Sequence, residues 1–193
     1  MCKVIGLTGP TGAGKSSVSS YLRDNGYHVV DCDVFAKQVM DSDPECLQKL
    51  QQAFGDCFDN SKLNRKKLGK LVFSDKLALK TLNDIVNPLI IKALQKYVKS
   101  CGEEVVVFDG ATLIECGAVS MCSAMIGVLA SRETRLDRIM ARDGLSQQLA
   151  DDRINSQPDD GFYHFNCTHV VYNDSELLAV CDQVINIIKE AIT

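Results

Sequence analysis

The sequence has few of the residues and patterns that mark metal-binding and secreted proteins. It contains no tryptophan and only three histidines, His28, His164 and His169, no two of which stand at metal-ligand spacing. Its nine cysteines include no C-x-x-C pair, which excludes the usual zinc motifs and a secreted disulfide framework. We therefore expect the cysteines to be reduced and mostly buried as small apolar side chains.

Long apolar runs and an excess of positive charge are also absent. No stretch of about 18 apolar residues is present, so no membrane span is predicted. After Met1 the chain enters the strand-like "KVIGLTG" without the basic and apolar regions of a signal peptide. The net charge of -4 argues against a surface that coats nucleic acid. We expect a cytoplasmic protein, monomeric or weakly homo-oligomeric, with neither nucleic-acid nor membrane partners.

The pattern of apolar residues predicts an α/β fold. Five short, β-branched runs read as strands buried on both faces, which indicates a parallel sheet covered by helices. Helices are predicted between and after them, with capping residues at Ser131 and Ser146 and a helix end at Gly144. The predicted strands are 3–8, 28–31, 104–109, 124–130 and 168–173, and the predicted helices include 15–25, 132–143, 147–156 and about 175–191.

The segment between the second and third strands is too long for a single crossover. It spans about 70 residues, against the dozen or more that a crossover needs, and its contents are helical. We expect one helix capped by Ser42 or Asp43, and two more that are separated at Asn87-Pro88, where the helix should break or kink. This helical insertion should lie near the carboxyl ends of the strands, where open α/β sheets bind ligands.

The strongest motif is "GPTGAGKS", residues 9–16, which matches G-x-x-x-x-G-K-[ST] between a strand and a helix. Glycines let the backbone curl so that several N–H groups point at a phosphate chain, and the following helix adds its positive end. Lys15 should reach the β- and γ-phosphates, and the Ser16 hydroxyl should bind Mg²⁺. The residues predicted to contact the nucleotide are Thr11, Gly12, Ala13, Gly14, Lys15, Ser16 and Ser17.

Two carboxylates follow the second predicted strand. Asp31 and Asp33 are two residues apart, and in an extended segment they would point to the same side. Kinases that act on hydroxyls need a carboxylate near the acceptor to take or orient its proton. The alternative is a pair of loop acids that cap the helix beginning near Val34.

Asp109 ends the third strand, in the place of a Walker B acid that holds Mg²⁺ directly or through water. We also assign it to the substrate-binding side of the site. The alternative is that it satisfies a nearby backbone N–H group.

Arginines gather after the fourth strand. Arg135, Arg138 and Arg142 recur at i, i+3 and i+7 and so share one helix face. Small-molecule kinases carry a mobile lid at this position, which brings arginines onto the developing phosphoryl charge. We place a lid at about 132–158, although an arginine run can also be a solvated helix face. No N-K-x-D occurs to specify guanine, which weakens a GTPase interpretation.

Taken together, these segments resemble the dephospho-CoA kinase family along nearly the whole chain. The loop and the Asp-x-Asp pair are shared with other kinases. The segments "LNRKKLGKLVFSD", with Arg65, Leu68, Val72 and Phe73, and "RIMARDGLS…RINSQ" are more specific. The chain departs from the family pattern at Asn87, where histidine is usual, at "DGATL" after the third strand, and at Pro10-Thr11 in the loop.

The resemblance implies a five-stranded parallel P-loop kinase core at 1–40 and 101–193. The insertion at 41–100 would be the CoA-substrate domain. ATP would donate its γ-phosphoryl group to the ribose 3′-hydroxyl of dephospho-CoA, with Mg²⁺ as cofactor. By that resemblance Asp33 is the base, Lys15 and Ser16 contact phosphate and metal, Arg138 and Arg142 are lid arginines, and Arg65 binds substrate.

Two other classes of function stay open at this point. One is another small-molecule P-loop kinase, acting on shikimate, gluconate or a nucleotide, although an insertion of about 60 residues exceeds what a small polyol needs. The other is a non-catalytic nucleotide switch, which has no use for Asp33 or for the lid arginines.

Overall fold

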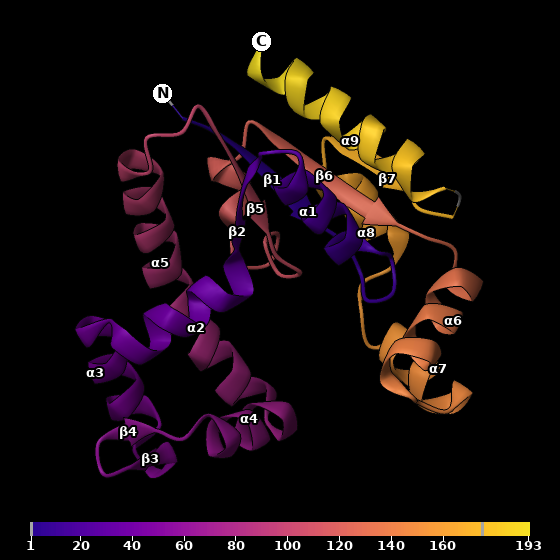
Figure 1. Ribbon diagram of the computed structural model, residues 1–193. Helices are drawn as coiled ribbons and strands as arrows, with labels where there is room; N and C mark the ends of the chain where they lie inside the picture. The colour runs from indigo at the N-terminus through magenta and orange to yellow at the C-terminus, as the bar shows by residue number, and fades with distance from the viewer. Residues whose placement is uncertain (1, 175) are drawn as a thin grey trace. The chain divides into compact units, whose positions relative to one another are not determined.

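The computed structural model describes residues 2–174 and 176–193 (Figure 1). These residues form two compact units, which we describe separately. The first unit combines Met1–Asp31 with Cys101–Thr193, and the second is Cys32–Ser100. The second unit begins at Cys32, whereas the sequence places the start of the insertion at about Asp41; the assignment of this segment to substrate binding stays a prediction.

The first unit is built on a five-stranded sheet. Its strands are β1 (Lys3–Thr8), β2 (His28–Asp31), β5 (Val105–Asp109), β6 (Ala124–Leu129) and β7 (His169–Tyr172). They lie in the order β2-β5-β1-β6-β7, and every neighbouring pair is parallel. The α/β class and the five predicted strands are therefore confirmed. Side chains on both faces of these strands are buried. On one face Ile5, Val107 and Ile126 are 0% exposed, and on the other Val106, Phe108 and Met125 are at most 1% exposed. The strands are therefore covered on both sides.

Helices α1 (Lys15–Asp24) and α9 (Leu177–Ile192) cover one face of this sheet (Figure 1). Their apolar sides join one buried cluster with the strands, to which they contribute Val18, Leu22, Val180, Val184 and Ile188. Helix α8 (Asp160–Asn166) packs on β6 and β7 from the other face of the sheet. Tyr163 of this helix lies against Gly127. Gly127 comes between Ile126 and Val128, whose side chains point toward α1 and α9, so its own position faces the opposite side.

The helix ends follow the predicted capping signals. Helix α6 (Arg132–Asp143) begins after Ser131, whose hydroxyl accepts from the Thr134 N–H, and ends at Gly144 in the left-handed conformation. Helix α7 (Gln147–Asn155) is capped in the same way by Ser146. A short 3-10 helix, η2 (Ala118–Met121), precedes β6. The last helix, expected from about Ser175, begins at Leu177; Ser175 itself lies outside the described residues.

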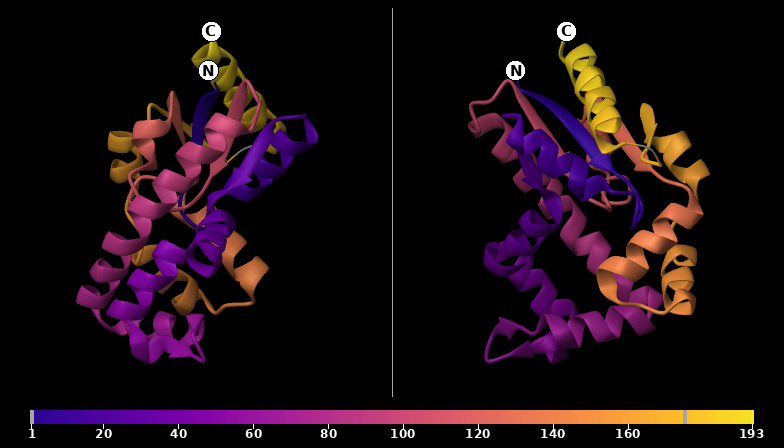
Figure 2. Two further views of the ribbon diagram at one scale, coloured as in Figure 1. Left: turned by 90° about the vertical axis from the view of Figure 1, so that its left-hand side faces the viewer. Right: turned by 45° about the vertical axis from the view of Figure 1, so that its right-hand side comes forward.

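The second unit is helical. It contains α2 (Cys32–Ser42), α3 (Pro44–Ala53), the 3-10 helix η1 (Gly55–Cys57), α4 (Arg65–Ser74) and α5 (Lys76–Ser100). Helices α2, α3 and α4 pack along the long helix α5 (Figure 2). Of the two expected caps for α3, it is Asp43 that accepts from the Cys46 N–H, at 2.8 Å. No helix of the described residues is long and apolar enough to cross a bilayer.

A small hairpin in the second unit was not predicted. Strands β3 (Phe58–Asp59) and β4 (Lys62–Leu63) pair in antiparallel register around Asn60 and Ser61. These two residues have φ of 49° and 65°. Positive φ at both central positions is typical of a tight two-residue hairpin turn, and asparagine tolerates it better than most residues. Strands of two residues are too short to show an alternating pattern in the sequence.

Of the break or kink expected at Asn87-Pro88, the break into two helices is wrong, and the kink stays a prediction. One continuous 25-residue helix, α5, passes through Pro88. Proline removes one backbone donor and crowds the carbonyl four residues earlier, which costs about 3 kcal/mol in an isolated helix interior. Burial of Val86, Leu89, Ile90 and Leu94 around the proline keeps the two halves in one helix.

The argument from an extended segment for Asp31 and Asp33 is also wrong. Asp31 is the last residue of β2, but Asp33 already lies in the first turn of α2. The two side chains therefore do not lie on the same side of one strand. An acid in the first turn of a helix is favoured by the positive end of the helix dipole.

Candidate functional site

The loop 9–14 joins β1 to α1 and forms one wall of a cleft of about 800 Å³ in the first unit. Gly12 and Gly14 have φ of 80° and 90°, a region that residues with a Cβ rarely adopt. Gly14 is also the N-cap of α1, so the positive end of that helix opens at the loop. A curled backbone and a helix N-terminus together make a site for an anion such as a phosphate.

Gly14→Ala is expected to lower the free energy of unfolding by about 2–4 kcal/mol, from left-handed strain and overpacking. A Cβ at this position would lie 2.0 Å from Nδ2 of Asn173, which is buried. Urea unfolding measures the change, with Gly69→Ala as the matched control. A Cβ at Gly69, inside α4, meets nothing within 4 Å, so that variant should be as stable as the parent or more so. Equal stabilities for the two variants would contradict the prediction.

Lys15, the first residue of α1, forms an ion pair with Asp109 at the end of β5. The second carboxylate oxygen of Asp109 accepts from the Ser19 hydroxyl at 2.6 Å, and Nη2 of Arg23 lies 3.8 Å from it. Asp109 is only 7% exposed. Within the described residues its hydrogen-bond donors are side chains, which is not the arrangement expected if it served a backbone N–H group. The acid is thus held directly beside the loop lysine.

Helix α6 faces the loop with its arginines. Arg138 donates to the carbonyl of Asn173 at 2.9 Å and, at 3.4 Å, to those of Gly12 and Ala13. The Arg142 Nη2 lies 3.4 Å from the Thr11 hydroxyl. Both arginines line the cleft. The run of arginines on α6 is therefore turned toward the loop and is not simply a solvated face.

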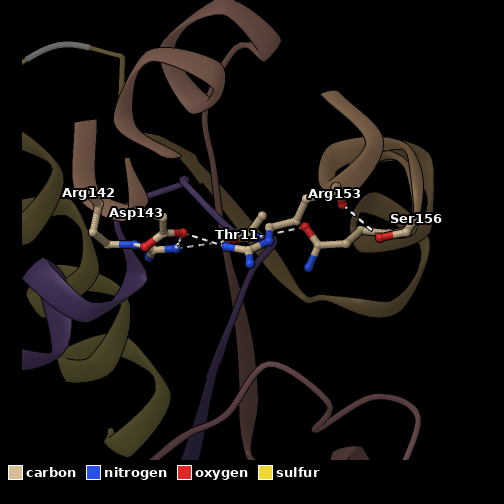
Figure 3. A network of polar contacts seen from close by, with 6 residues as sticks. Thr11, Arg142, Asp143, Arg153 and Ser156 are labelled. Carbon is tan, nitrogen blue, oxygen red and sulfur yellow. Dashed lines mark hydrogen bonds and ion pairs between the residues drawn. The ribbon is translucent and has the colours of Figure 1, made fainter. Parts of the chain in front are cut away.

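Arg142 also belongs to a chain of polar contacts on α6 and α7 (Figure 3). Its Nε and Nη2 donate to the two carboxylate oxygens of Asp143 at 2.8 and 2.9 Å. Asp143 accepts from Arg153 as well, and the Arg153 carbonyl accepts from the Ser156 hydroxyl at 2.8 Å. The hydrogen bond from Arg142 lowers the pKa of Asp143, so this carboxylate stays ionised and orients the guanidinium.

The structure brings most of the predicted loop residues into one cleft. Its lining includes Thr11, Gly12, Gly14, Lys15, Ser16, Ser17, Arg138 and Arg142. Ala13 differs, because its side chain is fully buried and its N–H donates to the Pro10 carbonyl at 3.2 Å. The contacts of all these residues with a nucleotide stay predictions.

Two predicted residues belong to the second unit. Asp33 lies exposed in the first turn of α2. Arg65, the first residue of α4, forms an ion pair with Asp41 at 2.9 Å and donates to the Lys37 carbonyl at 2.7 Å. These contacts fix the guanidinium against the end of α2. The roles of Asp33 as base and of Arg65 in substrate binding stay predictions.

Three residues that hold the loop were given no individual role from the sequence, although Arg135 was counted in the arginine run. Arg135 is 5% exposed and donates to the Thr11 carbonyl at 3.0 Å. Gln157 accepts from the Thr11 N–H at 2.9 Å. Asn173, 3% exposed, donates to the Ala13 carbonyl at 2.8 Å. The regular spacing of the arginines was a signal for Arg135, but nothing in a single sequence distinguishes Gln157 or Asn173 from neighbouring polar residues.

A five-stranded parallel sheet, a glycine loop leading into a helix and a lysine paired with the acid of a neighbouring strand define a P-loop phosphotransferase. Comparisons with known proteins narrow this class. The sequence pattern of the dephospho-CoA kinase family matches residues 3–179. The chain belongs to the dephospho-CoA kinase family. Family membership implies that it uses ATP and a small-molecule acceptor.

Individual relatives agree with this assignment. The chain is 38% identical over 163 residues to the dephospho-CoA kinase of Listeria monocytogenes, covering 81% of each chain. It is 34% identical to that of Saccharomyces cerevisiae, covering 97% of this chain and 82% of the relative. A crystal structure of a Thermus thermophilus protein superposes with a TM-score of 0.83 at 29% identity, covering 100% of this chain and 98% of that one.

Proposed function

We propose that this protein phosphorylates the ribose 3′-hydroxyl of dephospho-CoA with ATP, giving coenzyme A and ADP. ATP as the phosphoryl donor is supported by one observation, a single cleft. It is lined by the glycine loop, Lys15, Ser16, Arg138 and Arg142. Three cations and the start of a helix around one space match the charge of a triphosphate. Membership of the dephospho-CoA kinase family supports dephospho-CoA as the phosphoryl acceptor.

In this proposal the acceptor hydroxyl attacks the γ-phosphorus of ATP. A bond forms between the 3′-oxygen and phosphorus, the bond from phosphorus to the β,γ-bridging oxygen breaks, and ADP leaves. The Asp33 carboxylate takes the proton of the hydroxyl, as a general base. Lys15 and Arg142 stabilise the negative charge that spreads over the transferring phosphoryl group and the leaving ADP.

Mg²⁺ is the metal that we propose for this site. Ser16 opens onto the cleft, and Asp109 lies beside Lys15 at the end of β5. A hydroxyl and a carboxylate are oxygen ligands of the kind that Mg²⁺ prefers, and together with phosphate oxygens and water they suit its octahedral shell. When bound, the ion would neutralise phosphate charge and fix the triphosphate for transfer.

The acceptor is proposed to be held by the segment 41–100. Arg65 offers a fixed guanidinium for a phosphate group of dephospho-CoA. Phe73, at 94% exposed, and Leu77, at 71%, lie on the surface of the same unit. Lys70, Lys76 and Lys80 are close to them in the sequence. Apolar surface beside positive charge suits a substrate that has an apolar arm and a diphosphate.

A coupled assay of ADP release tests the acceptor directly. Dephospho-CoA, shikimate, gluconate and AMP are offered in parallel at equal concentration with MgATP. We expect turnover with dephospho-CoA to exceed that with each other acceptor by at least about 10³-fold in kcat/KM, since a site that hydrogen-bonds one substrate rejects unlike ones by such factors. Turnover with AMP or a sugar acid, and none with dephospho-CoA, would overturn the proposed function.

A further inference from the structure

The peptide groups of Thr11 are held from outside the loop. Its N–H donates to the Gln157 side-chain carbonyl at 2.9 Å, and its carbonyl accepts from Nε of Arg135 at 3.0 Å. Nη2 of Arg135 in turn donates to the same Gln157 oxygen, at 3.3 Å. Both polar groups of one loop residue are therefore fixed by two side chains that also contact each other.

Arg135 is an unusual residue to find at this place. It is 5% exposed, and burial lowers its pKa. In the part of the chain that the structure describes, no carboxylate forms an ion pair with it. A buried guanidinium costs free energy unless its donors are satisfied, and here the acceptors that satisfy it are the Thr11 carbonyl and Gln157.

The contact between α6 and the loop is close as well as polar. A Cβ added to Gly12 would lie 2.8 Å from the Arg135 carbonyl oxygen and 3.0 Å from its Cα. The loop therefore rests against the backbone of α6 one residue after Thr11. Gln157 lines the phosphate cleft and also a second hollow of about 360 Å³, which Arg135 shares, so it stands between the cleft and the back of the loop.

We infer that Arg135 and Gln157 are positioning residues for the nucleotide. They hold the Thr11 peptide from behind, so that the rest of the loop is already curled with its N–H groups toward the cleft when ATP arrives. Preorganised donors bind a phosphate more tightly because the loop loses less conformational freedom on binding. This inference rests on the proposed function only for ATP as the ligand of the loop.

Gln157→Leu tests the inference because it keeps the size of the side chain and removes the acceptor of the Thr11 N–H. Titration calorimetry with Mg²⁺ and adenylyl imidodiphosphate, which is not hydrolysed, should show Kd raised about 10-fold, the size expected for one lost hydrogen bond in an ordered loop. The KM for dephospho-CoA should stay within about twofold. The matched control is Gln148→Leu on α7, whose amide donates to Asp152 at 3.1 Å on the surface, and its Kd should not change.

Arg135→Lys is a second test of the inference. It keeps the positive charge, but an ammonium group cannot donate to Thr11 and Gln157 at once with the planar geometry of a guanidinium. If both residues act through Thr11, the double variant should raise Kd by clearly less than the product of the two single effects. Should Arg135→Lys fail to fold, Gln157→Leu decides alone.

The inference is overturned if Gln157→Leu binds the analogue within twofold of the parent, or if it raises the KM for dephospho-CoA as much as the nucleotide Kd. A lower melting temperature with an unchanged Kd would mean a purely structural role and would overturn it too. The calorimetric measurements of analogue binding do not require dephospho-CoA. A parent protein that binds the analogue but does not turn over dephospho-CoA would refute the proposed function and leave this test intact.

Discussion

Lys15→Met is expected to lower kcat for phosphoryl transfer by about 10²–10³-fold, the loss seen when one preorganised charge or donor to a transition state is removed. Methionine keeps most of the length and apolar contacts of the lysine side chain and removes the charge. That charge is proposed to rest on the β- and γ-phosphates, where negative charge shifts as the bond to ADP breaks. The coupled assay of ADP release measures the change.

The ion pair with Asp109 makes a stability measurement part of this experiment. Among the described residues, losing Lys15 leaves the buried Asp109 carboxylate with only Ser19 hydrogen-bonded to it and Arg23 nearby. Some destabilisation is therefore expected. Urea unfolding of the variant shows whether the assay is run on folded protein. Lys189→Met on the exposed side of α9 is the matched control and should keep full turnover. If folded Lys15→Met retained kcat within about threefold, Lys15 would have no catalytic role.

Asp33→Asn should lower kcat by about 10²–10⁴-fold, because general-base catalysis contributes that much. The Kd for a non-hydrolysed ATP analogue should stay within about twofold, since only the acceptor-side carboxylate is changed. Asp31→Asn, at the end of β2, is the comparison that decides which of the two acids acts as the base. Both acids were candidates from the sequence, and they lie on different elements, a strand and a helix.

Asp84→Asn serves as the control for the same unit. Asp84 is an exposed acid of α5 that forms an ion pair with Lys80, and its loss should not alter turnover. Loss of turnover in Asp31→Asn with near-normal turnover in Asp33→Asn would transfer the role of base to Asp31. Near-normal turnover in both variants would mean that neither carboxylate takes the proton.

Local signals in the sequence were enough for the five strands of the first unit and for its helices α1, α6, α7 and α9, but they did not predict α8 or η2. Five β-branched runs predicted five strands, and Ser131, Ser146 and Gly144 marked helix ends that the structure has. Such signals work because a helix cap or a buried strand is determined by residues that are close together in the sequence. They failed at Pro88, because burial of the surrounding apolar residues maintains the helix in spite of the local preference.

The loop motif and its lysine were also fixed by sequence, since G-x-x-x-x-G-K-[ST] requires particular residues at particular spacings for its backbone to curl around a phosphate. Resemblance in the specific segments was enough to indicate the family. What holds the loop came only from the tertiary structure. Arg135 and Gln157 lie more than 120 residues from Thr11 along the chain, and their contacts depend on how α6 and the residues after α7 pack on the first unit. No local pattern records which side chain will meet a peptide group that distant in sequence.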